Sequence, residues 1–361
     1  MKFIHIADMH FDRPFVNLSD KGIMGDMRRI EQRKVLKKVI EYIKENEIKY
    51  LFISGDLYEN EYVKESTIEY INNLFKEIPE TSIFISPGNH DPLIKNSYYN
   101  KFKWNENVKI FNDKIEKIET KDCDIYGYGF NDFYCTDCGI ENFEIENKEK
   151  INILIIHGTI DGGDIEEKQY NSISKNTLNS KGFDYVALGH IHKSNYNAEL
   201  EQNIIYPGST VSLGFDELGE HGMIVGDIEK DKLNLKFIPL DEKQFKEIEM
   251  DISKIISKEE LIEKINEMEI NENEYVKIIL TGNRNFEINN YDILKYILNE
   301  KIIKIKNATK IAYDLNKLKN ENTLKGIFVN EIINLLKNNE INEEEKETIE
   351  KALEIGLNAL E

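Results

Sequence analysis

Seven residues of types that bind metal ions follow short apolar runs of this sequence. The runs FIHIA, YLFIS, SIFIS, NILII and DYVAL lead to Asp8, His10, Asp56, Asn89, His157, His190 and His192. Four imidazoles, two carboxylates and one amide oxygen form a mixed nitrogen and oxygen set, which suits Mn²⁺, Fe or Zn²⁺ better than Mg²⁺. Because one ion would not use seven ligands, the pattern predicts two divalent ions, which at about 3.5–4 Å apart could activate water and clamp a phosphate ester.

The elements that must position these residues are strands of an α/β domain. Short apolar runs alternate with longer amphipathic ones, which predicts strands over 2–7, 50–54, 82–86, 151–156 and 185–188 and helices over about 30–43 and 63–75. In α/β sheets, ligands collect at the carboxyl ends of the strands. A single sheet would therefore bring together side chains that lie far apart in the sequence.

Composition and charge restrict the classes of function. A hydrophobic content of 40% suits a globular protein, and neither a signal segment nor a run of 18 apolar residues is seen, so we expect a cytoplasmic protein that does not span a membrane. The formal net charge of −20 argues against binding nucleic acid through the overall field. Local basic clusters at 28–38 and 295–325 are either substrate-facing or solvated helix faces.

Two domains are expected, with a boundary near residue 240. The pattern changes there from strand and turn segments to a composition rich in Glu, Lys, Asn and Ile, which predicts a core domain over 1–240 and a smaller α+β unit over 241–361. Cys135 and Cys138 have the CxxC spacing of some zinc and redox sites, but no further ligands lie at suitable spacing. An ordinary loop is the simpler interpretation of this pair.

The motifs as a set resemble those of the calcineurin-like metallophosphoesterases. The five blocks are DMH at 8–10, GD at 55–56, GNHD at 88–91, HG at 157–158 and GHIH at 189–192. The following segment YPGSTVSLGFDELGEHG resembles the SbcD-type DNA repair exonuclease subunits, and the C-terminal LKGIFVNEI resembles their shorter YhaO-like branch. The resemblance implies a four-layer αββα sandwich, followed by a smaller C-terminal α+β capping domain and terminal helices.

The resemblance also implies roles for individual residues. Asp8, His10 and His192 would hold one ion, Asn89, His157 and His190 the other, and Asp56 would bridge them. His90 would face the scissile phosphate and protonate or stabilise the leaving oxygen, and Asp91 would orient His90. Glu59, in the block GDLYE, would lie just behind the ligands.

Three functions are compatible with these residues. The first is a Mn²⁺-dependent DNA exonuclease or endonuclease that works as a homodimer with an SbcC-like coiled-coil ATPase docked on the terminal helices. Its candidate phosphate contacts are Lys301, Lys304, Lys306 and Lys310. The second is a phosphatase or phosphodiesterase for small nucleotides or phosphoproteins, which the acidic balance favours. The third is a non-catalytic scaffold that binds DNA or an ATPase, with the terminal helices packing on their own domain as the simpler alternative to docking.

Overall fold

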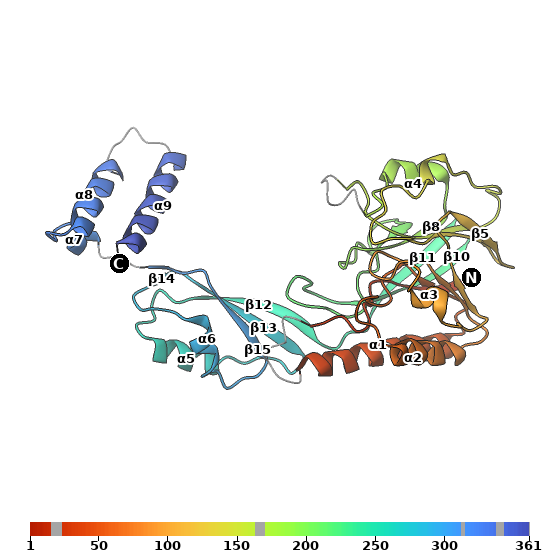
Figure 1. Cartoon of the computed structure of the whole chain (residues 1–361), viewed down its shortest axis with the longest axis horizontal. Helices are drawn as coiled ribbons and strands as arrows, with labels where there is room; N and C mark the ends of the chain where they lie inside the picture. The colour runs from red at the N-terminus through yellow and green to blue at the C-terminus, as the bar shows by residue number, and fades with distance from the viewer. Residues whose placement is uncertain (16–23, 163–169, 312–314, 337–342, 361) are drawn as a thin grey trace. The chain divides into compact units, whose positions relative to one another are not determined.

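The described part of the chain forms two compact units. The computed structural model describes residues 1–15, 24–162, 170–311, 315–336 and 343–360. The units are Met1–Lys246 and Glu247–Glu361 (Figure 1). The change of composition placed the boundary after residue 240, at the end of a strand, whereas the chain runs on within the first unit to Lys246.

The first unit contains two sheets that are rich in parallel pairs. The first sheet has the order β11 (Lys232–Pro239), β10 (Gly222–Glu229), β1 (Lys2–Ile6), β2 (Tyr50–Ile53), β3 (Ser82–Ile85) and β4 (Val108–Ile110). The second has the order β5 (Glu116–Glu119), β6 (Asp124–Tyr128), β7 (Asn152–His157), β8 (Tyr185–Gly189) and β9 (Ile204–Ile205). Strands β1 to β4 are mutually parallel, as are β6 to β9. The expected strands at 2–7, 50–54, 82–86, 151–156 and 185–188 are confirmed to within about one residue at either end.

Alternating side chains of each strand divide the core into layers. In β2, Phe52 faces the second sheet, while Leu51 and Ile53 face the helices. In β7, Ile153 and Ile155 face the first sheet, whereas Leu154 and Ile156 face outward to the covering segments. Both faces of these strands are buried, which is why they appear in the sequence as continuous apolar runs rather than alternating ones.

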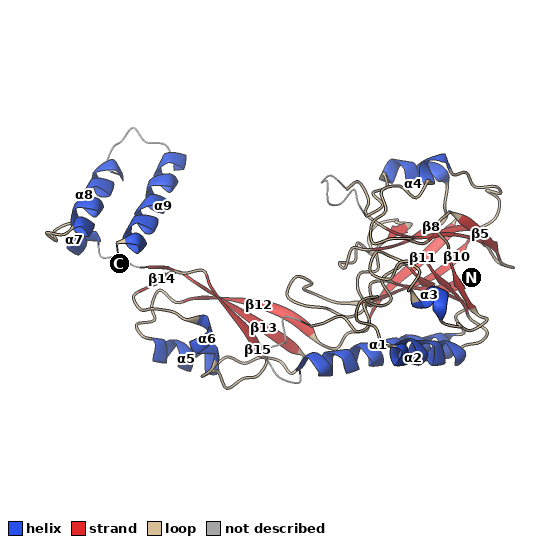
Figure 2. Ribbon diagram, viewed as in Figure 1, coloured by secondary structure: helices blue, strands red, loops and turns tan. Residues whose placement is uncertain are grey.

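Helices and loops cover the outer faces of the two sheets (Figure 2). Helices α1 (Met24–Asn46) and α2 (Glu65–Lys76) pack on the first sheet. In α1 the buried residues recur at helical spacing, among them Leu36, Ile40 and Ile43. The second sheet is covered by α4 (Lys175–Lys181), by the 3₁₀ turn η2 (Ile140–Asn142) and by loops. The short α3 (Tyr98–Lys101) adds to the first layer, so the expected order of helix, sheet, sheet and helix is confirmed for the described residues.

One chain of buried hydrogen bonds crosses between the sheets. His5 on β1 is 2.9 Å from the hydroxyl of Tyr185 on β8 and 2.9 Å from Ser54 Oγ after β2. Ser54 Oγ in turn donates to the carbonyl of Ala187 at 3.0 Å. Burial lowers the pKa of His5 to about 3, so its ring is neutral and can both donate and accept. These bonds fix the position of one sheet against the other next to the strand ends.

The second unit consists of a three-stranded and a two-stranded sheet with two helices, and of three further helices. Its strands are β12 (Gln244–Asp251), β13 (Glu274–Thr281), β15 (Ile302–Asn307) and the short β14 (Asn283–Arg284) and β16 (Lys310–Ile311). Helices α5 (Lys258–Asn266) and α6 (Asn290–Leu294) contribute to its core. The helices α7 (Leu315–Leu318), α8 (Leu324–Leu336) and α9 (Glu343–Ala359) share another core. No helix within the described ranges is long and apolar enough to cross a membrane.

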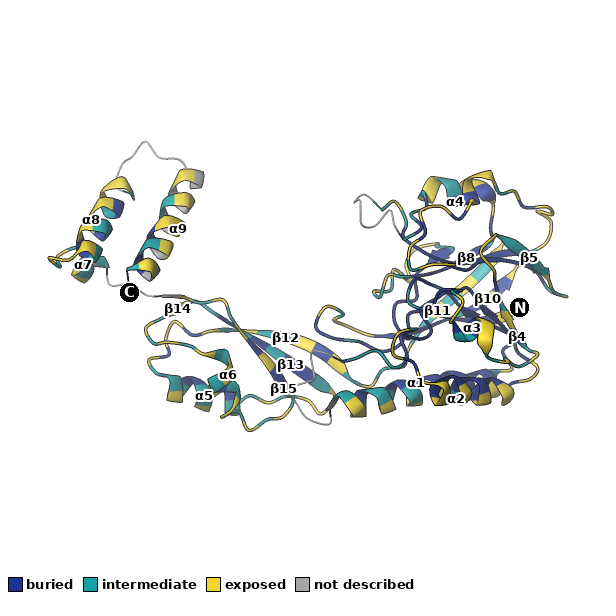
Figure 3. Ribbon diagram, viewed as in Figure 1, coloured by how far each residue is buried: buried dark blue, intermediate teal, exposed yellow. Residues whose placement is uncertain are grey.

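The apolar stripes of α8 and α9 are only partly covered. Val329 and Ile332 on α8 pack with Leu353 and Leu357 on α9. Leu324, Ile327, Leu335 and Ile355 are 69%, 62%, 51% and 63% exposed, and Figure 3 shows the exposed bands along both helices. The two helices therefore bury apolar residues against each other on one side and leave apolar residues exposed on the other side.

The basic cluster at 28–38 is not a single exposed patch. Arg28 is fully buried, and its guanidinium pairs with both carboxylate oxygens of Asp241, with Glu31 and with the carbonyl of Ser212. Arg33 donates to Asp12 at 3.0 Å. The expectation that this whole cluster is either DNA-facing or solvated is wrong for Arg28, which ties α1 to the segment after β11.

Removing this buried arginine should destabilise the first unit strongly. Arg28→Ala leaves the Asp241 carboxylate buried without its cation, which typically costs about 3–5 kcal/mol of stability. Arg29→Ala is the control, because Arg29 pairs with the exposed Asp26 and such pairs contribute about 0–1 kcal/mol. Urea denaturation followed by tryptophan fluorescence measures both. Equal unfolding midpoints for the two variants would contradict the role of Arg28 as a brace.

Candidate metal centre

The seven candidate ligands lie at the carboxyl ends of β1, β2, β3, β7 and β8. Asp8, His10, Asp56 and His190 have positive φ angles of 51°, 48°, 52° and 100°. Residues with side chains rarely adopt such angles, and the cost of about 1–3 kcal/mol for each is a mark of functional loops. The loops turn sharply at the strand ends and direct these side chains back over the sheets.

Two glycines allow the loops to approach one another. A Cβ atom on Gly88 would lie 2.3 Å from Asp56 Oδ1, and one on Gly189 would lie 1.8 Å from the carbonyl oxygen of Ser54. No side chain can be accommodated at either position without moving a candidate ligand or the backbone behind it. This close approach explains why glycines lie next to the ligands in the sequence.

The donor atoms converge from both sheets into a connected cluster. Three sets of residues each have ligand atoms within 4.8 Å of one another: Asp8 with His10 and His192, His10 with Asp56 and His90, and Asp56 with His157 and His190. The amide oxygen of Asn89 lies 3.0 Å from His157 Nε2 and 3.2 Å from His190 Nδ1. All seven residues singled out in the sequence therefore lie together.

The hydrogen bonds of two imidazoles fit a cation between them. His10 Nδ1 donates to Glu59 at 2.9 Å and His192 Nδ1 donates to Glu217 at 2.5 Å. In the neutral rings both Nε2 atoms then carry lone pairs, yet these atoms face each other at 3.1 Å. Burial lowers the pKa of His10, which favours the neutral form of that ring, whereas at His192 the Glu217 carboxylate outweighs burial and raises the pKa. A divalent cation in place of a proton would accept both Nε2 lone pairs, so the donor set suits the ions that the sequence predicted.

The other half of the cluster shows the same convergence around Asp56. His157 Nδ1 donates to the carbonyl of Ser54 at 2.8 Å, and its Nε2 lies 3.3 Å from Asp56 Oδ2. Burial disfavours a charged His157, but the Asp56 carboxylate outweighs burial and raises the pKa of His157 to about 9. Burial and the nearby His157 lower the pKa of His190 to about 3. The Asp56 carboxylate therefore attracts positive charge to the centre of the cluster.

Glu217 is a member of the site that the sequence analysis did not single out. Its carboxylate accepts from His192 Nδ1, from Ser209 Oγ at 2.9 Å and from the backbone N–H of Leu213 at 3.0 Å. Burial opposes its charge, but His192 outweighs burial and lowers the pKa of Glu217 to about 2. The only signal in the sequence was its place in FDELGEHG, shortly after the last ligand block.

The Glu217 carboxylate should strengthen metal binding through His192. Glu217→Gln removes the charge that orients the ring and makes it more basic, so we expect affinity for Mn²⁺ to fall about 10- to 100-fold. The control is Glu220→Gln, an exposed glutamate of the same segment. Isothermal titration of metal-free protein with Mn²⁺ measures this without relying on turnover. Unchanged affinity in Glu217→Gln would contradict the assignment.

Glu59 connects a candidate ligand to His90. One of its oxygens accepts from His10 Nδ1, and the other accepts from His90 Nδ1 at 2.9 Å. Burial opposes the charged form of His90, but Asp56 and Glu59 outweigh it and raise the pKa of His90 to about 9. The side chain of His90 is 39% exposed, unlike the buried ligands around it. His90 is therefore held from behind, with part of its ring open to solvent.

The expectation that Asp91 orients His90 is wrong. Asp91 is buried and accepts from the backbone N–H groups of Asp56, Leu57 and Gly88 at 3.1, 2.7 and 2.6 Å and from the Tyr99 hydroxyl at 2.6 Å. These four donors engage both oxygens of the carboxylate, whereas His90 Nδ1 is paired with Glu59. Asp91 holds the loops after β2 and β3 together, and Glu59 orients the histidine.

The four candidate lysines belong to the second unit. Lys304 and Lys306 are exposed and alternate along β15, so they share one face of the small sheet. Lys310 is exposed at the start of β16, and Lys301 is half-buried before β15.

Cys135 and Cys138 lie in a loop of the first unit. Both are buried, and neither is among the groups of described residues that could hold a metal ion. Cys135 Sγ lies 3.1 Å from the Tyr128 hydroxyl. The interpretation as an ordinary, packed loop agrees with this burial.

A cleft of about 600 Å³ opens directly beside the donor cluster. Asn89, His90 and Glu59 form its inner wall, and the other lining residues are Arg13, Pro14, Glu61, Tyr62, Phe133, Tyr134 and Tyr170. Substrate can therefore reach the cluster from the side on which His90 is exposed.

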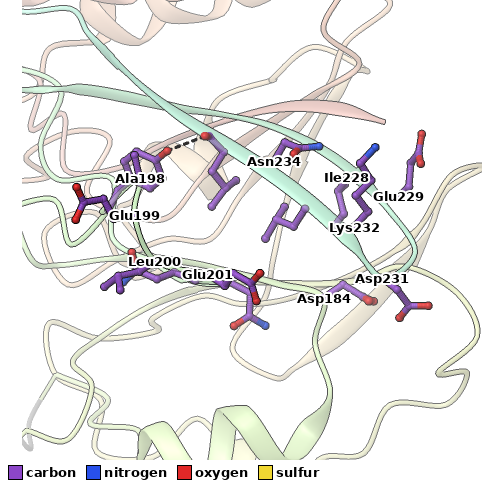
Figure 4. A pocket seen from close by; sticks show the side chains of 15 residues that line it. Asp184, Ala198, Glu199, Leu200, Glu201, Ile228, Glu229, Asp231, Lys232 and Asn234 are labelled. Atoms are coloured by element: carbon purple, nitrogen blue, oxygen red, sulfur yellow. Dashed lines mark hydrogen bonds between the residues drawn. The ribbon is translucent and has the colours of Figure 1, made fainter.

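A second hollow of about 690 Å³ lies at the entry ends of the strands (Figure 4). It is lined by Asp184, which precedes β8, and by Glu199, Glu201, Glu229 and Asp231 among others. The candidate ligands follow the exit ends of the strands. This acidic hollow is therefore separate from the site and does not resemble a place for a phosphate.

Comparison with known proteins identifies the family. A family model described as calcineurin-like phosphoesterase matches residues 1–194. The uncharacterised metallophosphoesterase YhaO of Bacillus subtilis (strain 168) is 25% identical over 247 residues, which are 66% of this chain and 60% of that protein. The SbcD subunit of nuclease SbcCD from Staphylococcus saprophyticus is 28% identical over 66% of this chain and 69% of its own length, and that from Staphylococcus epidermidis is 29% identical over 69% and 72%. The chain belongs to the calcineurin-like phosphoesterase family.

Proposed function

We propose that the chain is a Mn²⁺-dependent nuclease that hydrolyses phosphodiester bonds of DNA, acting from ends in repair or recombination. The observation that carries the proposal is the convergence of seven nitrogen and oxygen donors, with a half-exposed histidine beside them at an open cleft. The similarity to the SbcD subunits of two SbcCD nucleases supports DNA as the substrate. The nitrogen-rich donor set supports Mn²⁺, with Fe or Zn²⁺ as the other choices.

The seven donors would be divided between two ions. We assign Asp8, His10 and His192 to one ion and Asn89, His157 and His190 to the other. Asp56 would be shared, because its Oδ2 atom faces both His10 Nε2 at 3.7 Å and His157 Nε2 at 3.3 Å. Bound divalent ions supply positive charge that acidifies water and neutralises phosphoryl oxygens.

His90 would act on the oxygen that leaves. Its Nδ1 atom is held by Glu59, so Nε2 is the atom available to substrate in the cleft. A protonated ring can donate to the departing 3′-oxygen, which at neutral pH leaves poorly as an alkoxide. Glu59 keeps the ring in one orientation and balances the charge of the imidazolium. Asp91 contributes by holding the loops that carry Asp56 and His90.

The second unit and the terminal helices would recognise partners. The exposed Lys304 and Lys306 share one face and are candidates for phosphate contacts in a capping domain. The exposed apolar residues of α8 and α9 are candidates for docking an SbcC-like coiled-coil ATPase. Homodimerisation through α1 or α2 stays a prediction, for which the exposure of Met27 and Ile30 at 46% and 54% offers an apolar contact.

The competing function is a phosphodiesterase for small nucleotides, which the acidic net charge favours. Metal-free protein reconstituted with Mn²⁺, Mg²⁺ or Zn²⁺ should be assayed on linear duplex DNA and on a cyclic nucleotide. We expect Mn²⁺ to restore cleavage of the duplex and EDTA to abolish it. If only the cyclic nucleotide were hydrolysed, the nuclease function would be wrong and the phosphodiesterase function would take its place. Failure on both substrates, with no bound transition metal, would favour a scaffold.

A further inference from the structure

The cleft beside His90 has an aromatic wall that the metal chemistry does not require. The ring of Tyr170 lies 4.9 Å from that of His190, tilted by 31°, and the ring of Tyr134 lies 5.9 Å from that of Tyr170, tilted by 36°. The rings of His190, Tyr170 and Tyr134 thus form a continuous row from the donor cluster to the surface. Tyr134 and Tyr62 are 58% and 51% exposed, although aromatic residues usually bury most of their surface.

Backbone contacts connect the two loops that carry Tyr134 and Tyr170. Cys135 and Tyr170 form an isolated parallel bridge, and the N–H of Asn171 donates to the carbonyl of Cys135 at 2.6 Å. Asn171 also donates from its side chain to the carbonyl of His157 at 2.9 Å. The loop with Tyr134 and the loop with Tyr170 are therefore tied to each other and to a candidate ligand. An exposed ring on a loop that is held in this way is available for contact with a flat ligand.

The charges of the cleft determine which part of a nucleotide fits beside these rings. Glu59 and Glu61 line the same cleft, and Arg13 Nε is 3.7 Å from Glu59 Oε1. Carboxylates disfavour a second phosphate here, whereas a neutral base has a π-face for tyrosine to stack on. A volume of about 600 Å³ accommodates a nucleoside. In a duplex interior both faces of a base are covered, so the base must be unpaired or terminal.

We propose that Tyr134, with Tyr170 behind it and Tyr62 on the cleft wall, forms a subsite for an unpaired nucleobase next to the scissile phosphate. The proposal deepens the proposed nuclease function and rests on it. It predicts that the enzyme prefers frayed or single-stranded ends. It also predicts that nucleoside phosphodiesters are better substrates than esters of the same leaving group without a base.

Two small substrates separate the subsite from the chemistry. Hydrolysis of the p-nitrophenyl ester of thymidine 5′-monophosphate is compared with that of methyl p-nitrophenyl phosphate, which has no base. In Tyr134→Leu we expect KM for the thymidine ester to rise roughly tenfold, with kcat/KM for the methyl ester unchanged. Tyr134→Phe should restore the wild-type KM because the ring is kept. Tyr291→Leu, at an exposed tyrosine of the second unit, is the control.

Binding provides a readout that does not need turnover. Fluorescence anisotropy of a short labelled oligothymidylate should show tighter binding than an abasic oligonucleotide of equal length, and Tyr134→Leu should remove the difference. Equal binding of the two oligonucleotides by wild type, or an equal loss on both esters in Tyr134→Leu, would overturn the subsite. A third result is that wild type hydrolyses neither ester but binds the oligothymidylate more tightly than the abasic oligonucleotide. That result would support the subsite and contradict the proposed hydrolysis.

Discussion

Asp56→Asn is expected to lose metal ions and about three orders of magnitude in phosphodiester cleavage while keeping its fold. Asp56 Oδ1 accepts from the N–H of His90 at 2.8 Å, and Oδ2 faces the Nε2 atoms of His10 and His157. In the variant, the amide oxygen of the new asparagine can still accept from the N–H of His90. The NH₂ group then replaces Oδ2 and faces the Nε2 atoms of the two histidines. Because an NH₂ group carries no lone pair for a metal ion, it disfavours a cation between these atoms. The loss corresponds to about 4 kcal/mol of transition-state stabilisation, of the size that metal ions supply.

Three measurements test this prediction. Metal content after dialysis should fall relative to wild type, and nuclease activity should not return at millimolar Mn²⁺. In EDTA, the variant should unfold at a denaturant concentration no lower than that of wild type, because asparagine fills the same space and its NH₂ group can donate to the imidazoles. Asp216→Asn, at an exposed position, is the control. Full metal content with full activity in Asp56→Asn would remove Asp56 from the metal centre.

His90→Ala should retain both metal ions and lose about 10²- to 10⁴-fold in cleavage of DNA. His90 is attached to the site through Glu59 and is more exposed than the candidate ligands, so its removal opens the cleft without removing the main donors. The defect should depend on the leaving group. An alkoxide needs a proton, whereas p-nitrophenolate leaves without one, so the loss should be much smaller on a p-nitrophenyl ester.

Metal analysis and the two substrates distinguish the possible roles of His90. A lower metal content in His90→Ala would make it a ligand, which its position within 4.8 Å of ligand atoms of His10 and Asp56 allows geometrically. An equal loss on both substrates would argue for a positioning role instead of proton donation. Asp216→Asn, at an exposed position that does not line the cleft, serves as the control here as well.

Much of the candidate site could be predicted from local sequence. Each ligand follows an apolar run that is too short for a helix and too continuous for an exposed strand, so the run had to be a buried strand with its polar residue at the exit. The glycines next to Asp56, Asn89 and His190 marked sharp turns. These features involve only residues that are neighbours in the chain, which is why the expected strands are confirmed and the candidate ligands lie close together.

The residues that support the ligands could not be predicted in this way. Glu217 lies 25 residues after His192, and the Arg28 and Asp241 pair is separated by 213 residues. The resemblance implied that Asp91 orients His90, but the Asp91 carboxylate accepts from the backbone of the loop after β2 instead. Such partners depend on the paths that loops take between strands and helices, and hydrophobic periodicity does not predict those paths.

By itself, the sequence determined which residues could bind metal ions and that each of them ends a buried strand. The tertiary structure decided that the candidate ligands come from two sheets, with Asp8, His10, Asp56 and Asn89 from the first and His157, His190 and His192 from the second. It also decided that Glu59 and Glu217 orient the imidazoles and that Tyr134 stands exposed beside them. The physical reason is how far apart in the chain the interacting residues lie. Strand formation follows from local hydrophobic periodicity, whereas the direction of a buried polar side chain is set by whichever distant group satisfies its hydrogen bonds.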